Sequence, residues 1–237
     1  MRLGSLIFSS MSRTPVNARI ETPAPLSGDS DVLRVEGLAG YGGPGQTIAF
    51  AIPAGGAHVI AGGPGSGKTS LLELIAAARP PPQGRIELFG KNLESIGPRE
   101  RPRLRRRIGM IFHDLRLVED MSAHDNIALA ALAADRAPQN YEAEVAELLA
   151  WVGLTRKADV AAGSLNGEGR RRLAVARALI NRPELVVADE PFGDSTFKLL
   201  SDLNSGGIAI LIATRDLDLA VNAGAEITQL ADPGVRS

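Results

Sequence analysis

The residues with the clearest chemistry form a glycine-rich loop at 62–69, which matches G-x-x-x-x-G-K-[ST] at every defined position. Glycines let such a loop wrap backbone N–H groups around phosphate oxygens at a helix N-terminus, where the helix dipole also favours anions. Lys68 is expected to reach the β- and γ-phosphates, and the Thr69 hydroxyl to hold Mg²⁺. The loop therefore predicts a nucleotide site. Its expected contacts are Gly62, Gly63, Pro64, Gly65, Ser66, Gly67, Lys68, Thr69 and Ser70.

Two adjacent acids, Asp189 and Glu190, give a second chemical signal directly after an apolar run. A buried parallel strand delivers such residues to the edge of the sheet where the phosphate loop is expected. Asp189 is expected to support Mg²⁺ through water, and Glu190 to orient or deprotonate an attacking water as a general base. A solvated strand end is the alternative interpretation of this pair.

Short apolar runs predict the strands that position both signals. Runs at 32–35 and 47–52, separated by a glycine-rich turn, indicate an antiparallel β layer. The run at 58–61 predicts a buried strand that enters the loop, and a helix at 70–78 is expected to leave it. Further strands are expected at 85–89, 108–112, 185–188 and 208–213, and further helices at 126–134, 141–152 and 170–180.

The order of these elements predicts an α/β fold, in which an N-terminal antiparallel β subdomain and an inserted helical subdomain flank a phosphate-loop core. The domain is expected to span 32–237, with the helical subdomain at about 115–182. Residues 1–31 are rich in Ser, Pro, Thr and Gly without a hydrophobic period, so a disordered tail is expected there.

Composition excludes several classes of protein. The chain has 237 residues, of which 44% are hydrophobic and 22% charged, as in a soluble globular protein. A net charge of −1 argues against nucleic acid as a partner, and the absence of cysteine excludes disulfide scaffolds and thiolate metal sites. No stretch approaches the roughly 18 to 20 apolar residues that span a bilayer, so a membrane role is expected to be peripheral.

Together these motifs resemble those of the ATP-binding cassette (ABC) ATPases over about 32–230. Residues 170–179 resemble the family's signature helix, and 183–191 its second acidic motif. Within the family, the likeness is closest to cassettes of cell division, through residues 104–117, 151–154 and 203–216. Lipoprotein-release and macrolide-export ATPases share much of this pattern, so an ordinary transporter subunit is an alternative.

The resemblance implies an ABC-type nucleotide-binding domain that binds and hydrolyses ATP with Mg²⁺. It further implies a head-to-tail homodimer of cassettes and an FtsX-like integral membrane partner, with the chain on the cytoplasmic, inner face of the membrane. In this family an aromatic residue before the loop stacks on adenine. Tyr41 stands at that place, although a packing role is the alternative.

Several positions depart from the family pattern. The signature L-S-G-G-[EQ] is replaced by L-N-G-E-G at 165–169, so Asn166 and Gly167 stand where the partner's γ-phosphate would be contacted. Glu168 would repel a triphosphate unless its side chain turns away. His113 replaces a glutamine that helps to hold the metal, and imidazole is a poorer Mg²⁺ ligand than an amide oxygen. Thr196 stands where an interface aspartate is usual.

Arg215 replaces the family's switch histidine. It is expected either to stabilise transferred charge at the γ-phosphate, as an arginine finger does, or to be a solvated arginine at a strand end. Taken together, the departures predict ATP binding with slow or partner-dependent hydrolysis, or a nucleotide-gated scaffold with little turnover. An arginine-rich segment at 99–107 fits anionic lipid, an acidic protein segment or ordinary solvated surface.

Overall fold

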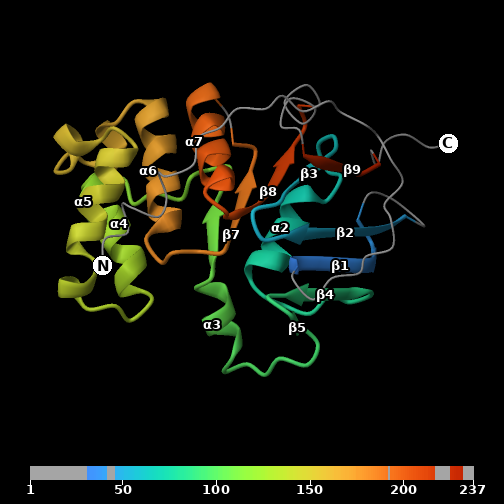
Figure 1. Cartoon of the computed structure of the whole chain (residues 1–237). Helices are drawn as coiled ribbons and strands as arrows, with labels where there is room; N and C mark the ends of the chain where they lie inside the picture. Colours follow the sequence, from blue (N-terminus) through green and yellow to red (C-terminus); the bar gives the residue numbers. More distant parts are fainter. Residues whose placement is uncertain (1–30, 42–45, 192, 217–224, 232–237) are drawn as a thin grey trace.

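The core of the molecule is a five-stranded parallel sheet in the order β6-β7-β8-β3-β9 (Figure 1). A computed structural model describes residues 31–41, 46–191, 193–216 and 225–231 of the chain. All neighbouring strands of this sheet run parallel, so their carboxyl ends meet at one edge. Its strands are β3 (Ala57–Ala61), β6 (Ile108–Ile111), β7 (Leu185–Asp189), β8 (Ala209–Thr214) and β9 (Glu226–Gln229).

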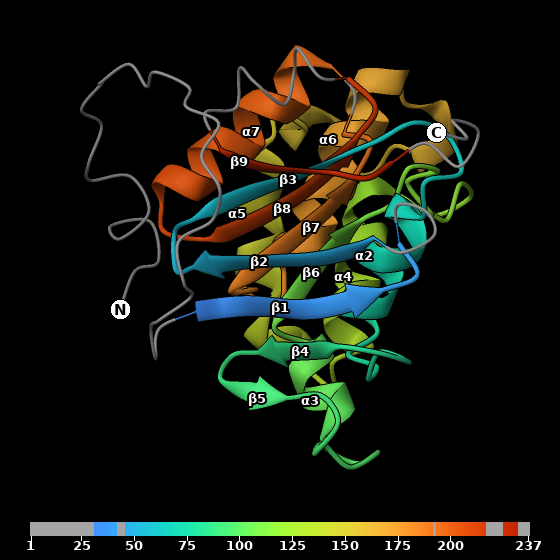
Figure 2. The ribbon, with the colours of Figure 1, turned by 90° about the vertical axis from the view of Figure 1, so that its right-hand side faces the viewer.

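Every residue of β7 and β8 is buried, because the sheet is covered on both faces. Alternate side chains face opposite sides, so Val187 and Leu211 join the core beneath α2 (Lys68–Ala76), whereas Val186 and Ile210 pack against α6 (Gly167–Leu179) and α7 (Asp194–Ser205). The two views in Figures 1 and 2 show these layers.

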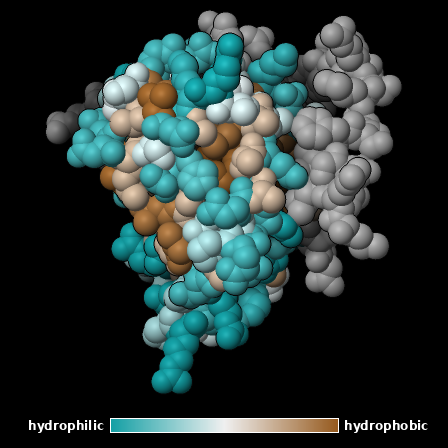
Figure 3. Space-filling model, turned by 90° about the vertical axis from the view of Figure 1, so that its left-hand side faces the viewer, coloured by the Kyte–Doolittle hydropathy of each residue, from teal (hydrophilic) through white to brown (hydrophobic). Residues whose placement is uncertain are grey.

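A separate apolar cluster holds the helical part together. Ile127 of α4 (Ala123–Leu132), Val145 of α5 (Glu142–Trp151) and Leu173 of α6 are all fully buried in it. Short 3₁₀ turns at Pro138–Asn140, Thr155–Lys157 and Ala162–Ser164 connect these helices. The side formed by α4 and α5 shows brown apolar patches separated by teal polar residues (Figure 3). Within the described residues, no helix combines the length and apolar character needed to cross a bilayer.

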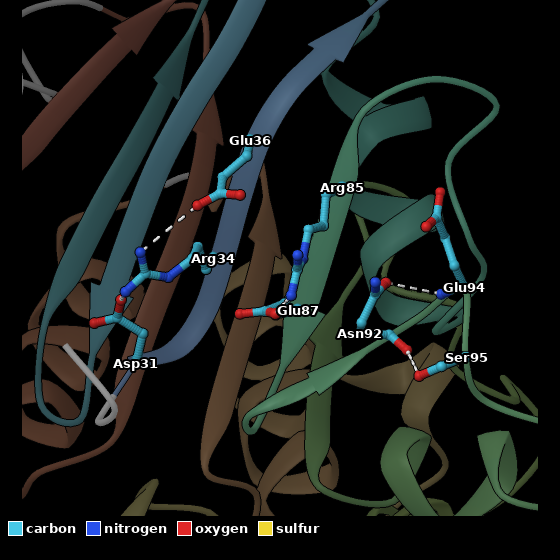
Figure 4. Close-up of polar contacts among 8 residues, drawn as sticks. All are labelled: Asp31, Arg34, Glu36, Arg85, Glu87, Asn92, Glu94 and Ser95. Carbon is cyan, nitrogen blue, oxygen red and sulfur yellow. Dashed lines mark hydrogen bonds and ion pairs between the residues drawn. The ribbon is translucent and has the colours of Figure 1, made fainter. Parts of the chain in front are cut away.

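An antiparallel sheet in the order β2-β1-β4-β5 covers the other side of α2. Its strands are β1 (Asp31–Ala39), β2 (Thr47–Pro53), β4 (Arg85–Leu88) and β5 (Lys91–Asn92), after which α3 (Arg101–Arg105) leads into β6. Ion pairs line its exposed face, where Arg34 contacts Asp31 at 2.6 Å and Arg85 pairs with Glu87 (Figure 4).

The α/β fold class predicted from the sequence is confirmed, but three helices begin earlier than predicted. α2 begins at Lys68 because Gly67, with φ 91°, leads directly into it. α4 begins at Ala123 and α6 at Gly167, because Ser122 and Asn166 cap their N-termini. The strand predicted at 32–35 begins at residue 31 and runs to Ala39. The expected tail otherwise falls on residues 1–30, outside the described part of the chain.

Candidate nucleotide-binding site

A cleft of about 520 Å³ opens at the carboxyl ends of β3, β6, β7 and β8, within the size range of ligand pockets. In an open α/β sheet this edge is the usual place for a ligand. The cleft contains most of the loop and both acids of the second motif. Its lining is Pro64, Gly65, Ser66, Gly67, Lys68, Thr69, Ser70, Phe112, His113, Asp114, Arg116, Asp189, Glu190 and Arg215.

The loop is compact and its lysine is folded over it. The Lys68 ammonium is almost fully buried and donates to the carbonyl oxygens of Gly62 and Gly63, at 2.5 and 2.9 Å. These two glycines supply carbonyls rather than cleft surface. The hydroxyl of Ser66 is buried without a hydrogen-bond partner in the described structure. The Lys68 ammonium and the Ser66 hydroxyl are thus two donors in the loop to which phosphate oxygens can hydrogen-bond.

Tyr41 lies against the loop rather than in the cleft. A Cβ atom on Gly67 would lie 3.2 Å from the Tyr41 ring, and the positive φ of Gly67 independently favours glycine there. Tyr41 also packs on the core, and burial raises the pKa of its hydroxyl, opposed by the charge of Arg79. The residue is therefore anchored beside the loop.

The side-chain oxygens of Thr69 and Asp189 lie together at the base of the cleft, and both are of the kind that binds metal ions. The Thr69 hydroxyl, at the start of α2, donates to Asp189 Oδ2 at 2.8 Å. Asp189, at the end of β7, is 3% exposed, and its Oδ1 has no hydrogen-bond partner in the described structure. A buried carboxylate oxygen without a partner beside a hydroxyl suits Mg²⁺, which binds one or two carboxylates and takes other ligands from phosphates and water.

The described residues contain no group of three or more acids and histidines able to hold a metal ion. His113 lines the cleft but is not gathered with Asp189 into such a group.

Glu190 is held at the mouth of the cleft by the end of β8. Its backbone has φ 47°, and its N–H donates to the Ala213 carbonyl at 2.8 Å. The carboxylate accepts from the Thr214 hydroxyl and the Arg215 backbone N–H, both at 3.3 Å. The Arg215 guanidinium lies 4.0 Å from the other carboxylate oxygen. Arg215 therefore shares the cleft with Glu190, as an arginine that acts on the γ-phosphate must.

A cavity of about 80 Å³ adjoins the cleft behind Glu190, and His113, Arg171 and Thr196 are among its lining residues. Thr196 is 1% exposed, and its hydroxyl has no hydrogen-bond partner in the described structure. The Nε of Arg171 is also buried without a partner there. Buried polar atoms of this kind usually bond to water or to a group that arrives with a ligand.

The residues predicted to stand at the signature position do not line the cleft. Asn166 is the N-cap of α6, and its side-chain oxygen accepts from the Gly169 N–H at 2.8 Å. Gly167 is the first residue of that helix. Glu168 pairs with Arg172 one turn along the same helix, so its carboxylate turns along α6. For these residues to reach a triphosphate, the triphosphate would have to lie in the cleft of a second chain.

Sequence reasoning missed three residues that shape the segment after His113. Arg116 lines the cleft, stacks over Phe112 at 3.7 Å and contacts Glu73 of α2 at 3.0 Å. Arg177 of α6 donates to the carbonyls of Leu115 and Arg116. Asn126 of α4 accepts from the Val118 N–H and donates to the carbonyls of Val118 and Met121. The only sequence signal was the position of Asn126 on the apolar face of a helix.

Several curated proteins and solved structures similar to the chain are ATP-binding cassettes. The cell division ATP-binding protein FtsE of Escherichia coli K12 is 32% identical over 194 residues, covering 79% of this chain and 87% of that protein. FtsE of Shigella flexneri gives the same values. Both relatives carry the name of the cell-division ATPase on which the resemblance was strongest.

Solved cassettes share the fold. A dimer of the ATP-binding cassette MJ0796 in a post-hydrolysis state, bound to ADP and phosphate, is 25% identical with a TM-score of 0.72, covering 85% of this chain and 95% of that one. CbiO1 from Clostridium perfringens has a TM-score of 0.74 at 24% identity, over 86% of each chain. Residues 46–193 match the family described as ABC transporter, and with the fold and the cleft this shows that the chain belongs to the ATP-binding cassettes of that family.

Proposed function

We propose that this chain is the ATPase subunit of an FtsE-like complex, which binds Mg–ATP in the cleft and hydrolyses it to drive an FtsX-like membrane partner in cell division. The partner would hold the chain at the inner face of the cytoplasmic membrane. The observation that carries the proposal is the convergence of Lys68, the Thr69–Asp189 pair and Glu190 in one cleft. The likeness to FtsE supports the choice of partner.

Binding would begin with an exchange of acceptors at Lys68. Its ammonium would leave the carbonyls of Gly62 and Gly63 for the β- and γ-phosphate oxygens, and the loop N–H groups would take the rest. Thr69 would hold Mg²⁺ directly and Asp189 would hold it through water, and the ion would neutralise charge on the phosphates. Tyr41, beside the loop, would lie against adenine.

Hydrolysis would use Glu190 as the base. The oxygen of a water attacks the γ-phosphorus while its proton passes to the Glu190 carboxylate, and the bond from that phosphorus to ADP breaks. The products are ADP and inorganic phosphate, and Glu190 then releases its proton to solvent. Arg215, beside Glu190, would stabilise the charge on the transferred group in place of a histidine. His113, two residues after β6, would be a further and poorer ligand for the metal.

Two copies would complete the site, because Asn166 and Gly167 lie outside the cleft of their own chain. A head-to-tail homodimer would present the N-terminus of α6 to the partner's γ-phosphate, where the helix dipole favours an anion. The side-chain oxygen of Asn166 is occupied as the cap, so its amide group is the donor available for that contact. This composite contact supports slow or partner-dependent turnover.

A nucleotide-gated scaffold is the second candidate function. The observation that favours it is the paired Glu168 carboxylate at the α6 N-terminus, which replaces a glycine of the usual signature. In this alternative, ATP binding alone recruits or clamps the membrane partner. The intact Glu190 and its hydrogen bonds from the end of β8 oppose this alternative.

Steady-state ATP turnover tests these candidates, with and without the FtsX-like partner in nanodiscs. Glu190→Gln is the blank, and Glu147→Gln, an exposed acid on α5, is the matched control. Turnover by the wild type and the control, but not by the blank, would support the ATPase. Equal rates in all three proteins, with ATP still bound, would reject hydrolysis in favour of the scaffold. The membrane partner is identified separately, by purifying the chain together with the membrane protein that it binds. If that protein is a transport permease instead of an FtsX-like protein, the division role is rejected.

A further inference from the structure

Positive charge is concentrated in one short segment of an otherwise acidic chain. Residues 99–107 contain six arginines and one glutamate, a formal charge of +5, whereas the whole chain carries −1. The rest of the chain therefore carries about −6, and the molecule has one basic end. An anionic surface would attract that end and repel most of the rest.

Only part of this charge is neutralised within the molecule. Arg106 contacts Asp135 at 2.6 Å, and Arg107 pairs with Glu184 while it stacks on a phenylalanine ring. The single acid of the segment, Glu100, is paired with Lys91. Within the described residues, no hydrogen bond or ion pair engages the side chains of the other four arginines. We name these the basic ridge: Arg99, Arg101, Arg103 and Arg105.

The fold holds three of the four ridge arginines outward: Arg99, Arg103 and Arg105 are exposed, whereas Arg101 is half-buried and its Nε is buried. Leu104 is 3% exposed and anchors α3 to the core beneath β1 and β4, so Arg103 and Arg105 on either side of it remain exposed. In Figures 1 and 2, α3 lies at the lower end of the molecule, next to β5, the edge strand of the antiparallel sheet. Neither of the two cavities described above includes a residue of the ridge. The ridge is thus a projecting cationic surface outside both of these cavities.

We propose that the basic ridge binds the anionic headgroups of a lipid bilayer directly. Guanidinium groups match phosphate oxygens in geometry and charge, and a projecting ridge can meet an extended flat surface without a groove. Two exposed leucines, Leu129 and Leu132, lie on α4, and the Arg106–Asp135 ion pair ties the loop after that helix to α3. Apolar side chains close to arginines are typical of surfaces that rest on a membrane interface. This contact requires no ATP hydrolysis and no membrane protein.

The test is sedimentation of the purified wild-type chain with vesicles of phosphatidylglycerol and phosphatidylcholine, without any membrane protein. Each arginine near such a surface contributes about a fivefold gain in affinity, so Arg103→Gln/Arg105→Gln is expected to weaken binding about twenty-fivefold. Vesicles of phosphatidylcholine alone should bind neither protein. Raised salt should release the wild type.

Arg156→Gln/Lys157→Gln is the matched control, because it removes the same charge from exposed positions in the turn between α5 and α6, outside the ridge. It should change binding less than twofold, and both double variants should keep the affinity of the wild type for ATP. Equal loss in the two variants would reject the ridge in favour of a general charge effect. Capture of the wild type by polyglutamate or duplex DNA, but not by anionic vesicles, would reject lipid as the occupant.

Discussion

Replacing Asn126 with alanine is expected to destabilise the helical part of the molecule by about 3 kcal/mol. The Asn126 side chain is 1% exposed, accepts from the Val118 N–H at 2.9 Å and donates to the carbonyls of Val118, Met121 and Ser122 at 3.0 to 3.2 Å. Its amide group has two hydrogens, so about three of these four contacts are full hydrogen bonds. Each contributes about 0.5 to 1.5 kcal/mol, and alanine leaves their partners unsatisfied.

Urea unfolding followed by fluorescence of Trp151, the single tryptophan, measures the loss. Trp151 packs against the same helical cluster, so its emission reports on this region. Asn140→Ala, at an exposed position, is the control and should cost less than about 0.5 kcal/mol. Asn126→Asp keeps the shape and the acceptor but faces three carbonyls with a carboxylate, and it should destabilise at least as much as alanine. A loss below about 1 kcal/mol for Asn126→Ala, or a tolerated aspartate, would refute the hydrogen-bond argument.

Three further predictions concern buried or capping groups. Burial lowers the pKa of His58 to about 4, so as pH falls the imidazole is protonated in the unfolded chain before it is protonated in the folded one. The free energy of unfolding should therefore fall by about 3 kcal/mol as pH drops from 6.5 to 4. Urea unfolding of His58→Gln across this range should show a shallower loss. Thr196→Val should raise the free energy of unfolding by about 1 kcal/mol, because it removes a buried hydroxyl without a partner in the described structure. A lower free energy of unfolding, measured by calorimetry, would contradict this. Asn166→Ala should lower the unfolding free energy by about 1 kcal/mol through loss of the α6 cap, whereas Asn166→Ser should retain most of it in the same assay.

The position of the cleft follows from patterns in the sequence. A continuous apolar run before residues 189–190 indicates a strand buried on both faces, and such strands share one carboxyl edge with the strand that enters the phosphate loop. The relative positions of Lys68, Asp189 and Glu190 could therefore be expected without long-range information.

The contacts that refine the cleft could not be predicted in this way. Arg116 reaches the cleft because residues 115 and 116 both adopt positive φ and Arg177 holds their carbonyls, which no local pattern encodes. Arg215 and Glu190 lie close together because of the register in which β7 and β8 pair. The direction of Glu168 depends on an arginine one helical turn away, although its spacing could have indicated that pair.

The position of β3 has a consequence for synthesis of the chain. β3 lies between β8 and β9, which begin about 150 and 170 residues after it. A growing chain on the ribosome carries the complete phosphate loop long before either neighbouring strand exists, and contacts of such sequence separation form late. Nascent chains that end before residue 209 should therefore fail to capture nucleotide, and the apolar β3 should need protection until β8 and β9 have been synthesised.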